Sequence, residues 1–285
     1  FSVARTIPAL CNHLAFLLPP EQLHIVLAMD RKTRQYGDSS AVRYKRSVIS
    51  LLYPECIMTT VLEARELWKV YETGTNRVEA LRKVSVKLKP GEMVAVMGPS
   101  GCGKTTLLNC LSGLDDISAG EVLIQGNPLS QLSDYDLTAL RGSQLGFIFQ
   151  SFNLLPVLTA VENVELPLLM AGISPSESRK RALDALKSVG LQDRGGHLPA
   201  ELSGGQQQRV TIARSFVHNP AVIFADEATG NLDSKTSDEI IDLLLKLNSE
   251  RNVTMMLVTH DPEIAARCSR ILVMQDGRII EDNLS

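Results

Sequence analysis

The sequence has no strong excess of charge of either sign. Its 285 residues include 29 Lys or Arg and 32 Asp or Glu, so the net charge at pH 7 is −3. Nucleic-acid-binding domains need a clustered basic excess against the phosphate backbone, and we therefore expect no nucleic-acid partner. With 44% hydrophobic residues, the chain is also too apolar for intrinsic disorder and has the composition of an ordinary globular protein.

Long hydrophobic runs are missing as well. No stretch reaches the roughly twenty apolar residues that span a bilayer. The nearest candidate, residues 7–18, is interrupted by Asn12 and His13 and is followed by Pro19-Pro20. It also lacks the basic start and the small-residue cleavage site of a signal peptide. We therefore expect no membrane-spanning segment.

The cysteines form no recognisable set of pairs or metal ligands. No two have CxxC spacing, no histidine accompanies them at zinc-ligand spacing, and they stand at Cys11, Cys56, Cys102, Cys110 and Cys268. An odd number of scattered cysteines argues against a disulfide framework and against a structural zinc site. A reducing, cytosolic environment fits this usage best.

Residues 1–57 differ from the rest of the chain in charge and pattern. They contain seven basic and four acidic residues and show no sustained period of 2 or 3.6. The chain begins with Phe1, and Met58 stands just ahead of the first strand-like run. Two interpretations are open, namely a native arm, or upstream sequence joined to a chain that naturally begins at Met58. We favour the second and expect residues 58–285 to form the functional domain.

From Met58 onward the pattern indicates an α/β fold. Continuous apolar runs at 93–97, 221–225 and 254–259 predict strands that are buried on both faces of a parallel sheet. A further run at 271–280, divided by Asp276-Gly277, predicts a hairpin. Helix signals lie between these strands, and strands alternating with helices define the α/β class.

Capping signals locate the starts of these helices. Ser174-Pro175-Ser176-Glu177 predicts a capping box with proline at the first helical position, and Gly190 can end that helix. Thr159 and Glu162 predict a second capping box, and Asp261-Pro262-Glu263 starts another helix directly after a strand. The first helix should bury one apolar face, formed by Ala182, Leu183, Leu186 and Val189.

One segment matches the phosphate-loop pattern G-x-x-x-x-G-K-[ST]. It follows the strand at 93–97, precedes a helix-like run that includes Thr106, and reads Gly98-Pro99-Ser100-Gly101-Cys102-Gly103-Lys104-Thr105. Glycines let consecutive backbone N–H groups turn around an anion, and a helix N-terminus adds partial positive charge. We expect Lys104 to reach the β- and γ-phosphates and Thr105 to ligate Mg²⁺. A chance glycine-rich turn is the alternative, and the flanking elements disfavour it.

Two acidic residues end the strand at 221–225. Asp226 stands where a carboxylate can reach the Mg²⁺ of the phosphate loop, and Glu227 follows where it could polarise an attacking water. Buried strands often end in acidic residues, so this pair carries weight only together with the phosphate loop.

A second glycine-rich segment, Leu202-Ser203-Gly204-Gly205-Gln206-Gln207-Gln208-Arg209, decides between phosphate-loop proteins. Here the sequence resembles ATP-binding cassette (ABC) ATPases, whose signature motif this segment matches. Ser203 can cap a helix, and Gly204 and Gly205 leave its first N–H groups open to an anion, with Gln206 completing the motif. The alternative is a glycine-rich helix cap without a ligand. The helix would bury Val210, Ala213, Phe216 and Val217.

The resemblance covers nearly all of residues 58–285 and implies a P-loop NTPase fold. That fold has a RecA-like core, an antiparallel β subdomain and a helical subdomain that carries the signature. The resemblance also implies roles for single residues. Tyr71 would stack on adenine, Gln150 would sense Mg²⁺ and water, Asp233 would communicate across a dimer, and His260 would contact the γ-phosphate. The alternatives are a half-buried strand tyrosine, a helix cap at Asp233 and a structural histidine.

The chain departs from the family at Ala228, where proline commonly follows the catalytic glutamate. Proline would bias Glu227 towards extended backbone, so alanine should hold Glu227 less rigidly without abolishing activity. Within the family, the segments 113–115, 118–122 and 150–156 are similar to the lipoprotein-release and macrolide-export group, with cell-division ATPases close by.

The resemblance further implies ATP and Mg²⁺ as cofactors and two cassettes packed head to tail around ATP. The dimer would be a homodimer or a heterodimer, bound peripherally to an integral-membrane permease at the cytoplasmic face of the plasma membrane. Residues 154–173 would receive a permease helix, or would simply pack in the core. Three rival classes of phosphate-loop protein fit the sequence less well. Repair ATPases need a long coiled coil between the phosphate loop and the signature segment, and translation ATPases need two cassettes in one chain. Small-molecule kinases would not need the signature segment at all.

Cys102 stands inside the phosphate loop near Lys104. The positive field of a helix N-terminus should favour its thiolate, so we expect faster alkylation than at Cys110. The alternative is a side chain that is turned into the core and shielded from reagents.

Overall fold

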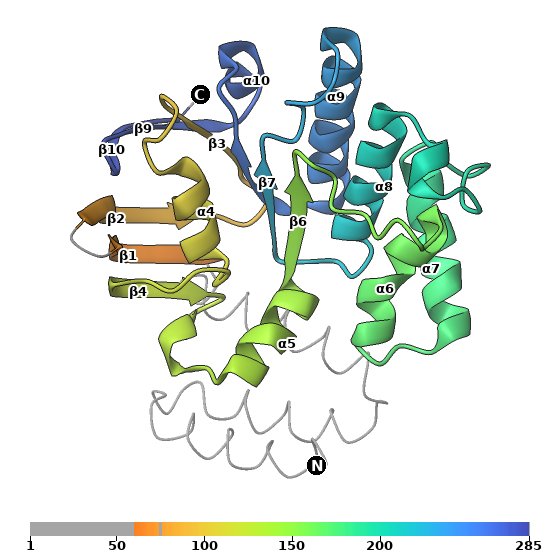
Figure 1. Cartoon of the computed structure of the whole chain (residues 1–285), viewed down its shortest axis with the longest axis horizontal. Coiled ribbons are helices and arrows are strands. Elements are labelled where there is room, and N and C mark those ends of the chain that lie inside the picture. Colours follow the sequence, from red (N-terminus) through yellow and green to blue (C-terminus); the bar gives the residue numbers. More distant parts are fainter. Residues whose placement is uncertain (1–59, 74–75, 285) are drawn as a thin grey trace, which may run out of the picture. The chain divides into compact units, whose positions relative to one another are not determined.

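A computed structural model describes residues 60–73 and 76–284 (Figure 1). The expectations for residues 1–57 and for a natural start at Met58 lie outside the described residues. In chain order the elements are β1 Leu62–Thr73, β2 Asn76–Leu88, β3 Met93–Met97, α4 Lys104–Leu111, β4 Ala119–Ile124, β5 Asn127–Pro128, the 3-10 turn η3 Leu129–Gln131, α5 Asp134–Gln144, β6 Leu145–Phe149, α6 Ala160–Met170, α7 Pro175–Ser188, the 3-10 turn η4 Pro199–Glu201, α8 Gly204–Phe216, β7 Val222–Asp226, α9 Ser234–Arg251, β8 Thr254–Val258, α10 Pro262–Ala266, β9 Arg270–Gln275 and β10 Arg278–Leu284.

A six-stranded sheet has the order β10-β9-β3-β8-β7-β6. The pairs from β9 to β6 are parallel, and β10 runs antiparallel to β9. The predicted strands at 93–97, 221–225 and 254–259 are β3, β7 and β8, and the predicted hairpin is formed by β9 and β10. The α/β class is confirmed.

Both faces of this sheet are buried, which explains why its strands show no alternation of apolar and polar residues. Met93 and Ala95 of β3 face a first core that includes residues of α6, α8 and α9. Val94 and Val96 face a second core, which α4 shares with the strands of the other sheet. Strands β3, β7 and β8 therefore contribute alternate residues to two separate apolar clusters.

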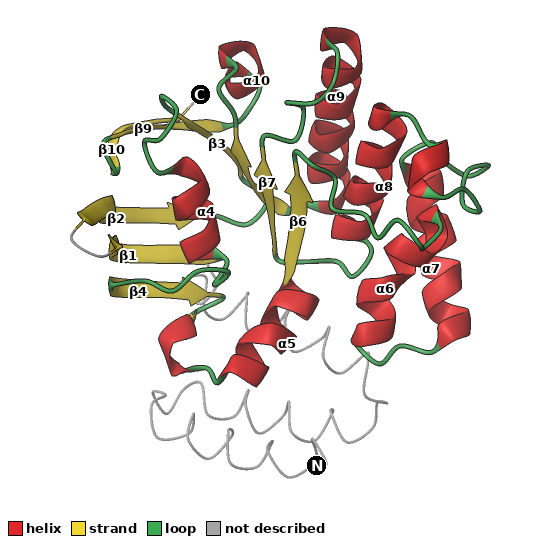
Figure 2. Ribbon diagram, in the orientation of Figure 1, coloured by secondary structure: helices red, strands yellow, loops and turns green. Residues whose placement is uncertain are grey.

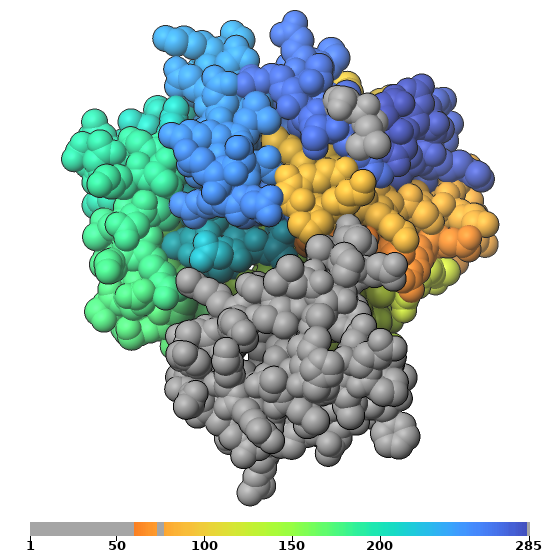
Figure 3. Space-filling view, turned by 180° about the vertical axis from the view of Figure 1, so that it is seen from behind, coloured from red at the N-terminus to blue at the C-terminus, as the bar shows by residue number. Residues whose placement is uncertain are grey.

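The second sheet is antiparallel, with the order β2-β1-β4-β5. In Figure 1 it lies beside α4, whereas α6, α7 and α8 gather on the other side of the central strands. Figure 2 shows the same division as a strand-rich side and a helix-rich side, and Figure 3 shows the two sides from behind, in orange to yellow and in green. The antiparallel and helical subdomains that the resemblance implies are both present.

Most of the predicted helix starts are correct, and one is wrong in detail. Thr159 forms a capping box with Glu162 at α6, and the carboxylate of Asp261 accepts N–H groups at the start of α10. Ser174 stands at the predicted start of α7 but makes no capping bond, because its hydroxyl lies against Ser176 and Glu177 binds Arg181 instead. The predicted apolar face of α7 is buried except at Leu183, which is 45% exposed.

No helix within residues 60–73 and 76–284 is both long and apolar enough to cross a membrane.

The two cores generate a prediction about the start of the domain. Among the residues that the structure describes, both cores are built from positions between 61 and 279, so we predict that a chain starting at Met58 folds by itself. Thermal unfolding followed by circular dichroism should give one cooperative transition within about 2–4 °C of that of the full chain, a shift that corresponds to about 1 kcal/mol for a domain of this size. Insolubility or a much lower midpoint would instead identify residues 1–57 as a structural arm.

The expectation of an accessible thiol at Cys102 is wrong, because its side chain belongs to the second core and is 6% exposed. Cys110 and Cys268 are buried too, and burial raises the pKa of each thiol to about 11, which leaves almost no reactive thiolate at pH 7. We therefore predict that all three thiols resist maleimide in the folded protein.

The test replaces Cys11 and Cys56 by serine and maps labelled cysteines by mass spectrometry. Labelling should be slow in native buffer and prompt in denaturing urea, where all three thiols are exposed. Prompt labelling of Cys102 in native buffer would restore the original expectation.

Candidate functional site

The phosphate loop joins the end of β3 to the start of α4. Gly98 has a φ of 147° and Gly103 a φ of 103°, values that side chains rarely allow. A Cβ atom at Gly98 would lie 2.2 Å from the carbonyl oxygen of Met274, and one at Gly103 would lie 2.5 Å from that of Ala80. Glycine is therefore required at both positions, because β9 and β2 approach the loop closely.

Lys104 is the first residue of α4 and is 8% exposed. Its ammonium donates hydrogen bonds to the carbonyl oxygens of Gly98 at 2.8 Å and Pro99 at 2.9 Å. Gly103 precedes the helix without a side-chain cap, so the first N–H groups of α4 are available to an anion. The loop thus places a cation and a helix N-terminus together.

Thr105 and Asp226 come together as the sequence predicts. The Thr105 hydroxyl donates to Asp226 Oδ1 at 3.3 Å, which joins the start of α4 to the end of β7. Burial raises the pKa of Asp226 above its ordinary value, while the bond from Thr105 and the charge of Lys104 oppose that rise. A hydroxyl and a carboxylate at this place form a pair of oxygen donors suited to a hard cation such as Mg²⁺.

Glu227 and His260 form a second pair at the ends of adjacent strands. His260 Nδ1 lies 3.6 Å from Glu227 Oε1, and the Glu227 backbone N–H donates to the Val258 carbonyl. Glu227 has a φ of 46°, in the left-handed region. The residue therefore departs from extended backbone, while the expectation that Ala228 holds Glu227 less rigidly stays a prediction.

The backbone after Glu227 is held from the signature helix. The side chain of Gln208, on α8, is fully buried and donates to the Ala228 carbonyl oxygen at 2.5 Å. The Ala228 side chain is itself 2% exposed in the first core. Gln208, which belongs to the signature segment, thus links α8 to the peptide beside Glu227, a contact that no sequence pattern predicted.

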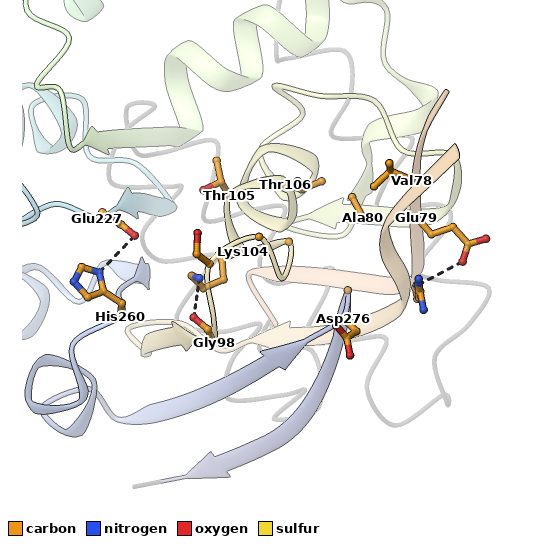
Figure 4. A pocket seen from close by; sticks show the side chains of 15 residues that line it. Val78, Glu79, Ala80, Gly98, Lys104, Thr105, Thr106, Glu227, His260 and Asp276 are labelled. Carbon is orange, nitrogen blue, oxygen red and sulfur yellow. Dashed lines mark hydrogen bonds and ion pairs between the residues drawn. The ribbon is translucent and has the colours of Figure 1, made fainter. Parts of the chain in front are cut away.

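A cleft of about 730 Å³ brings most of these residues together. Figure 4 shows Lys104, Thr105 and Thr106 in its middle, with Glu227 and His260 on one side and Val78, Glu79 and Ala80 on the other. Its lining is contributed by β2, the phosphate loop, the ends of β7 and β8 and the β9–β10 turn, and consists of Val78, Glu79, Ala80, Arg82, Gly98, Ser100, Gly101, Gly103, Lys104, Thr105, Thr106, Glu227, His260, Asp276 and Gly277.

The signature residues do not line this cleft. Ser203 caps α8 through a capping box in which its hydroxyl accepts the Gln206 N–H and Gln206 Oε1 accepts the Ser203 N–H. Gly204 and Gly205 occupy the first helical positions, and a Cβ atom at Gly205 would lie 2.6 Å from Thr236. The four predicted buried residues of this helix are all 6% exposed or less.

Gln150 and Asp233 also lie outside the cleft lining. Gln150 Nε2 donates to Asn231 Oδ1 at 3.1 Å, and Asn231 donates back to the Gln150 carbonyl at 2.9 Å. Asp233 caps α9 and accepts hydrogen bonds from the Thr236 N–H and hydroxyl, which lower the pKa of its carboxyl. The capping role considered for Asp233 is therefore present.

Tyr71 lies on β1 and is 39% exposed. It is absent from the cleft lining, but its direct partner in β2 is Val78, which lines the cleft. Its hydroxyl donates to Asp115 Oδ2 at 2.6 Å. Tyr71 thus lies on the strand next to the end of the cleft that Val78 and Ala80 form, opposite to Glu227.

Some lining residues had no signal in the sequence. Val78, Ala80 and Arg82 enter the cleft because β2 crosses the phosphate loop. Asp276 enters because its hairpin turn bonds to both elements, with the Arg82 N–H donating to the Gly277 carbonyl and the Gly277 N–H donating to the Cys102 carbonyl. The turn itself was predicted, but its place beside the loop follows from tertiary contacts.

Comparisons with known proteins agree with this geometry. A profile of the ABC transporter family matches residues 81–230. An uncharacterized ABC transporter ATP-binding protein of Thermotoga maritima is 49% identical over 222 residues, which cover 78% of this chain and 94% of the relative. The uncharacterized ABC transporter ATP-binding protein YbbA of Escherichia coli K12 is 48% identical over 78% of this chain and 97% of its own length.

Solved structures give the same result. A dimeric structure of the ATP-binding cassette MJ0796, in a post-hydrolysis state bound to ADP and Pi, has a TM-score of 0.73 and 44% identity over 78% of this chain and 98% of that one. The cassette cbiO1 of Clostridium perfringens has a TM-score of 0.72 and 31% identity over 79% of this chain and 89% of that one. The chain therefore belongs to the ABC transporter family, as an ATP-binding subunit that is an ATPase.

Proposed function

We propose that this chain binds MgATP, forms a head-to-tail dimer around the nucleotide and drives an integral-membrane permease of the lipoprotein-release or macrolide-export type. The observation that carries the proposal is the cleft that Lys104, Thr105, Glu227 and His260 line together, with Asp226 bonded to Thr105 just outside the lining. These groups suit phosphate binding, metal binding and water activation, and all of them except Asp226 line one cavity.

Mg²⁺ fits the donors at this place. Thr105 and Asp226 offer hard oxygen ligands, and Gln150 follows the neighbouring strand and would join them through its amide oxygen. When bound with ATP, Mg²⁺ neutralises charge on the β- and γ-phosphate oxygens. Lys104 would bind the same phosphates, supported by the first N–H groups of α4 and by the backbone of residues 98 to 103.

Glu227 and His260 would act at the γ-phosphate end of the cleft. Glu227 would orient and polarise the attacking water, and His260 would contact the γ-phosphate from the end of β8. At the opposite end, Val78 and Ala80 offer apolar surface for the base, and Tyr71 would stack on adenine from the adjacent strand. The cleft then has a hydrolytic end and a base end, separated by the phosphate loop.

A second cassette would complete the site. The helix N-terminus formed by Ser203, Gly204, Gly205 and Gln206 is an anion-binding surface that is absent from the chain's own cleft. MJ0796, which is similar over 98% of its length, forms a dimer. We infer that the signature helix of one subunit closes over ATP held by the other, in a homodimer or a heterodimer. ATP would then favour the closed state by binding both surfaces.

The permease would dock on the segment after Gln150. One face of α6 packs in the first core through Val161, Val164 and Leu168, so the core-packing alternative holds for that face. Val157, 82% exposed, and Leu155, 44% exposed, precede the helix on the surface. An apolar surface of this kind suits a short helix from a membrane partner. The cassette would then lie at the cytoplasmic face of the plasma membrane.

The catalytic role proposed for Glu227 gives a direct prediction. Glu227→Gln should keep ATP affinity within about threefold, because the amide preserves shape, and should lower turnover by about 10²–10⁴-fold, the usual contribution of a positioned general base. Size-exclusion chromatography with MgATP should then show an accumulated dimer. Glu250→Gln, an exposed change on α9, is the matched control. Wild-type turnover in Glu227→Gln would remove Glu227 from the mechanism.

Permease docking can be tested at Val157. Val157→Glu would place a charge in an apolar interface, so the amount of membrane protein that co-purifies from detergent-solubilised membranes of the native host should fall at least about tenfold. ATP hydrolysis by the isolated protein should not change. Tyr135→Glu, at an equally exposed site on α5, controls for added surface charge. Equal recovery of membrane protein with the two variants would contradict the docking surface.

A further inference from the structure

A small polar cluster lies behind the base end of the cleft. The carboxylate of Asp115 accepts two short hydrogen bonds, from Lys69 Nζ to Oδ1 at 2.6 Å and from the Tyr71 hydroxyl to Oδ2 at 2.6 Å. Lys69 also donates to the Asp116 carbonyl at 2.6 Å and is only 8% exposed. A lysine this deeply buried is ordinarily unfavourable, so the carboxylate beside it stabilises the arrangement.

The cluster holds the Tyr71 ring from two directions. Lys69 and Tyr71 are two residues apart on β1 and therefore lie on the same face of the strand. The Lys69 ammonium lies over the ring, 4.8 Å from its centroid, and Asp115 binds the hydroxyl at the other end of the side chain. Both the plane of the ring and the position of its hydroxyl are thereby fixed.

Asp115 is also tied to the phosphate loop through α4. The N–H groups of Leu114 and Asp115 both donate to the carbonyl oxygen of Asn109, in the last turns of the helix that begins at Lys104. Thr106, in the first turn of that helix and in the cleft lining, lies near enough to Tyr71 to lower the pKa of its hydroxyl. One rigid helix thus fixes the distance between the ring and the phosphate loop.

The charges of the cluster support each other. Burial pulls the pKa of Lys69 down, but the hydrogen bond and charge of Asp115 outweigh it, and the pKa is raised. Burial and the nearby Asp115 raise the pKa of Tyr71, so its hydroxyl stays protonated and donates. Burial raises the pKa of Asp115, but the bonds from Lys69 and Tyr71 lower it further than burial raises it. All three groups keep the protonation states that the geometry requires.

We propose that Asp115, together with Lys69, is a positioning residue that holds the Tyr71 ring at a fixed distance from the phosphate loop and so sets the affinity for the base of the nucleotide, not for its phosphates. The inference rests on the proposed stacking of Tyr71 on adenine. A ring that is already ordered loses less side-chain freedom when the base stacks on it. Releasing the ring should therefore weaken ATP binding about 3- to 10-fold, the effect of ordering one side chain.

Two ligands separate base recognition from phosphate recognition. ATP uses both ends of the cleft, whereas inorganic tripolyphosphate has no base and tests the phosphate loop alone. With Mg²⁺ present, calorimetry on the full chain should show that Asp115→Ala weakens ATP about 3- to 10-fold and leaves tripolyphosphate affinity within about twofold. KM for ATP should rise by a similar factor while kcat stays unchanged. A parallel loss for both ligands would mean a general structural role and would overturn the proposal.

Matched variants complete the test. Asp116→Ala removes the exposed carboxylate of the neighbouring residue and keeps the backbone carbonyl that binds Lys69. It should change neither the affinity for ATP nor that for tripolyphosphate. Asp115→Asn, which keeps an acceptor and should fold if Asp115→Ala does not, is expected to lose ATP affinity in the same direction. In a Tyr71→Ala background, Asp115→Asn should cause no further loss, because no ring is left to position.

The outcomes distinguish the inference from the function on which it rests. If Tyr71→Ala weakens ATP but Asp115→Asn does not, the positioning role is overturned while stacking stands. If Tyr71→Ala leaves ATP affinity unchanged, the stacking role itself is lost. A further loss on adding Asp115→Asn to Tyr71→Ala would show that Asp115 acts by another route, and would also overturn the inference.

Discussion

The chemistry of the cleft depends on the register of the parallel strands. Phe149 of β6 pairs with Asp226 of β7, Asp226 pairs with Val258 of β8, and Val258 pairs with Val96 of β3. Because parallel strands present their carboxyl ends at one edge, the residues just beyond these pairs emerge side by side. Those residues are Gln150, Glu227, Thr259, His260 and Gly98. No single loop could hold so many groups at fixed spacings.

Burial on both faces enforces this register. A slip of one residue would exchange the residues that face the two cores, and each core is filled by side chains from helices on its own side. The same burial allows the sheet to carry unfavourable groups at its edge. The pKa of Asp226 is raised by burial, so its ionised form opposes folding, and Glu227 occupies a left-handed backbone conformation. Burial of the apolar cores offsets the free-energy cost of the Asp226 carboxylate and of the Glu227 backbone conformation.

Local patterns in the sequence were enough to predict the central strands, the phosphate loop and the signature helix. Continuous apolar runs and glycine spacing are local features of the chain, so the elements that they predict do not depend on contacts between distant segments. The orientation of Cys102 was not predictable, because it depends on how Gly98 and Gly103 turn the loop against Met274 and Ala80. The walls of the cleft at Val78 and Asp276, and the bond from Gln208 to Ala228, arise only when distant segments meet. The missing cap at Ser174 is a competition between local hydrogen bonds that spacing alone cannot decide.

The two hydrogen bonds that Lys104 makes inside its own loop have a consequence for selectivity. A ligand that takes the ammonium must replace two carbonyl dipoles at 2.8 and 2.9 Å, so it gains only the difference between its own interaction and theirs. A neutral ligand would form hydrogen bonds with the Lys104 ammonium that are about as strong as those it displaces. A singly charged ligand would gain only a little more. A polyphosphate, with several negative charges close to the ammonium, would interact with it more strongly than either of these ligands. If the loop binds the phosphates of a nucleotide, as proposed, it would act as a charge threshold that disfavours weakly charged competitors.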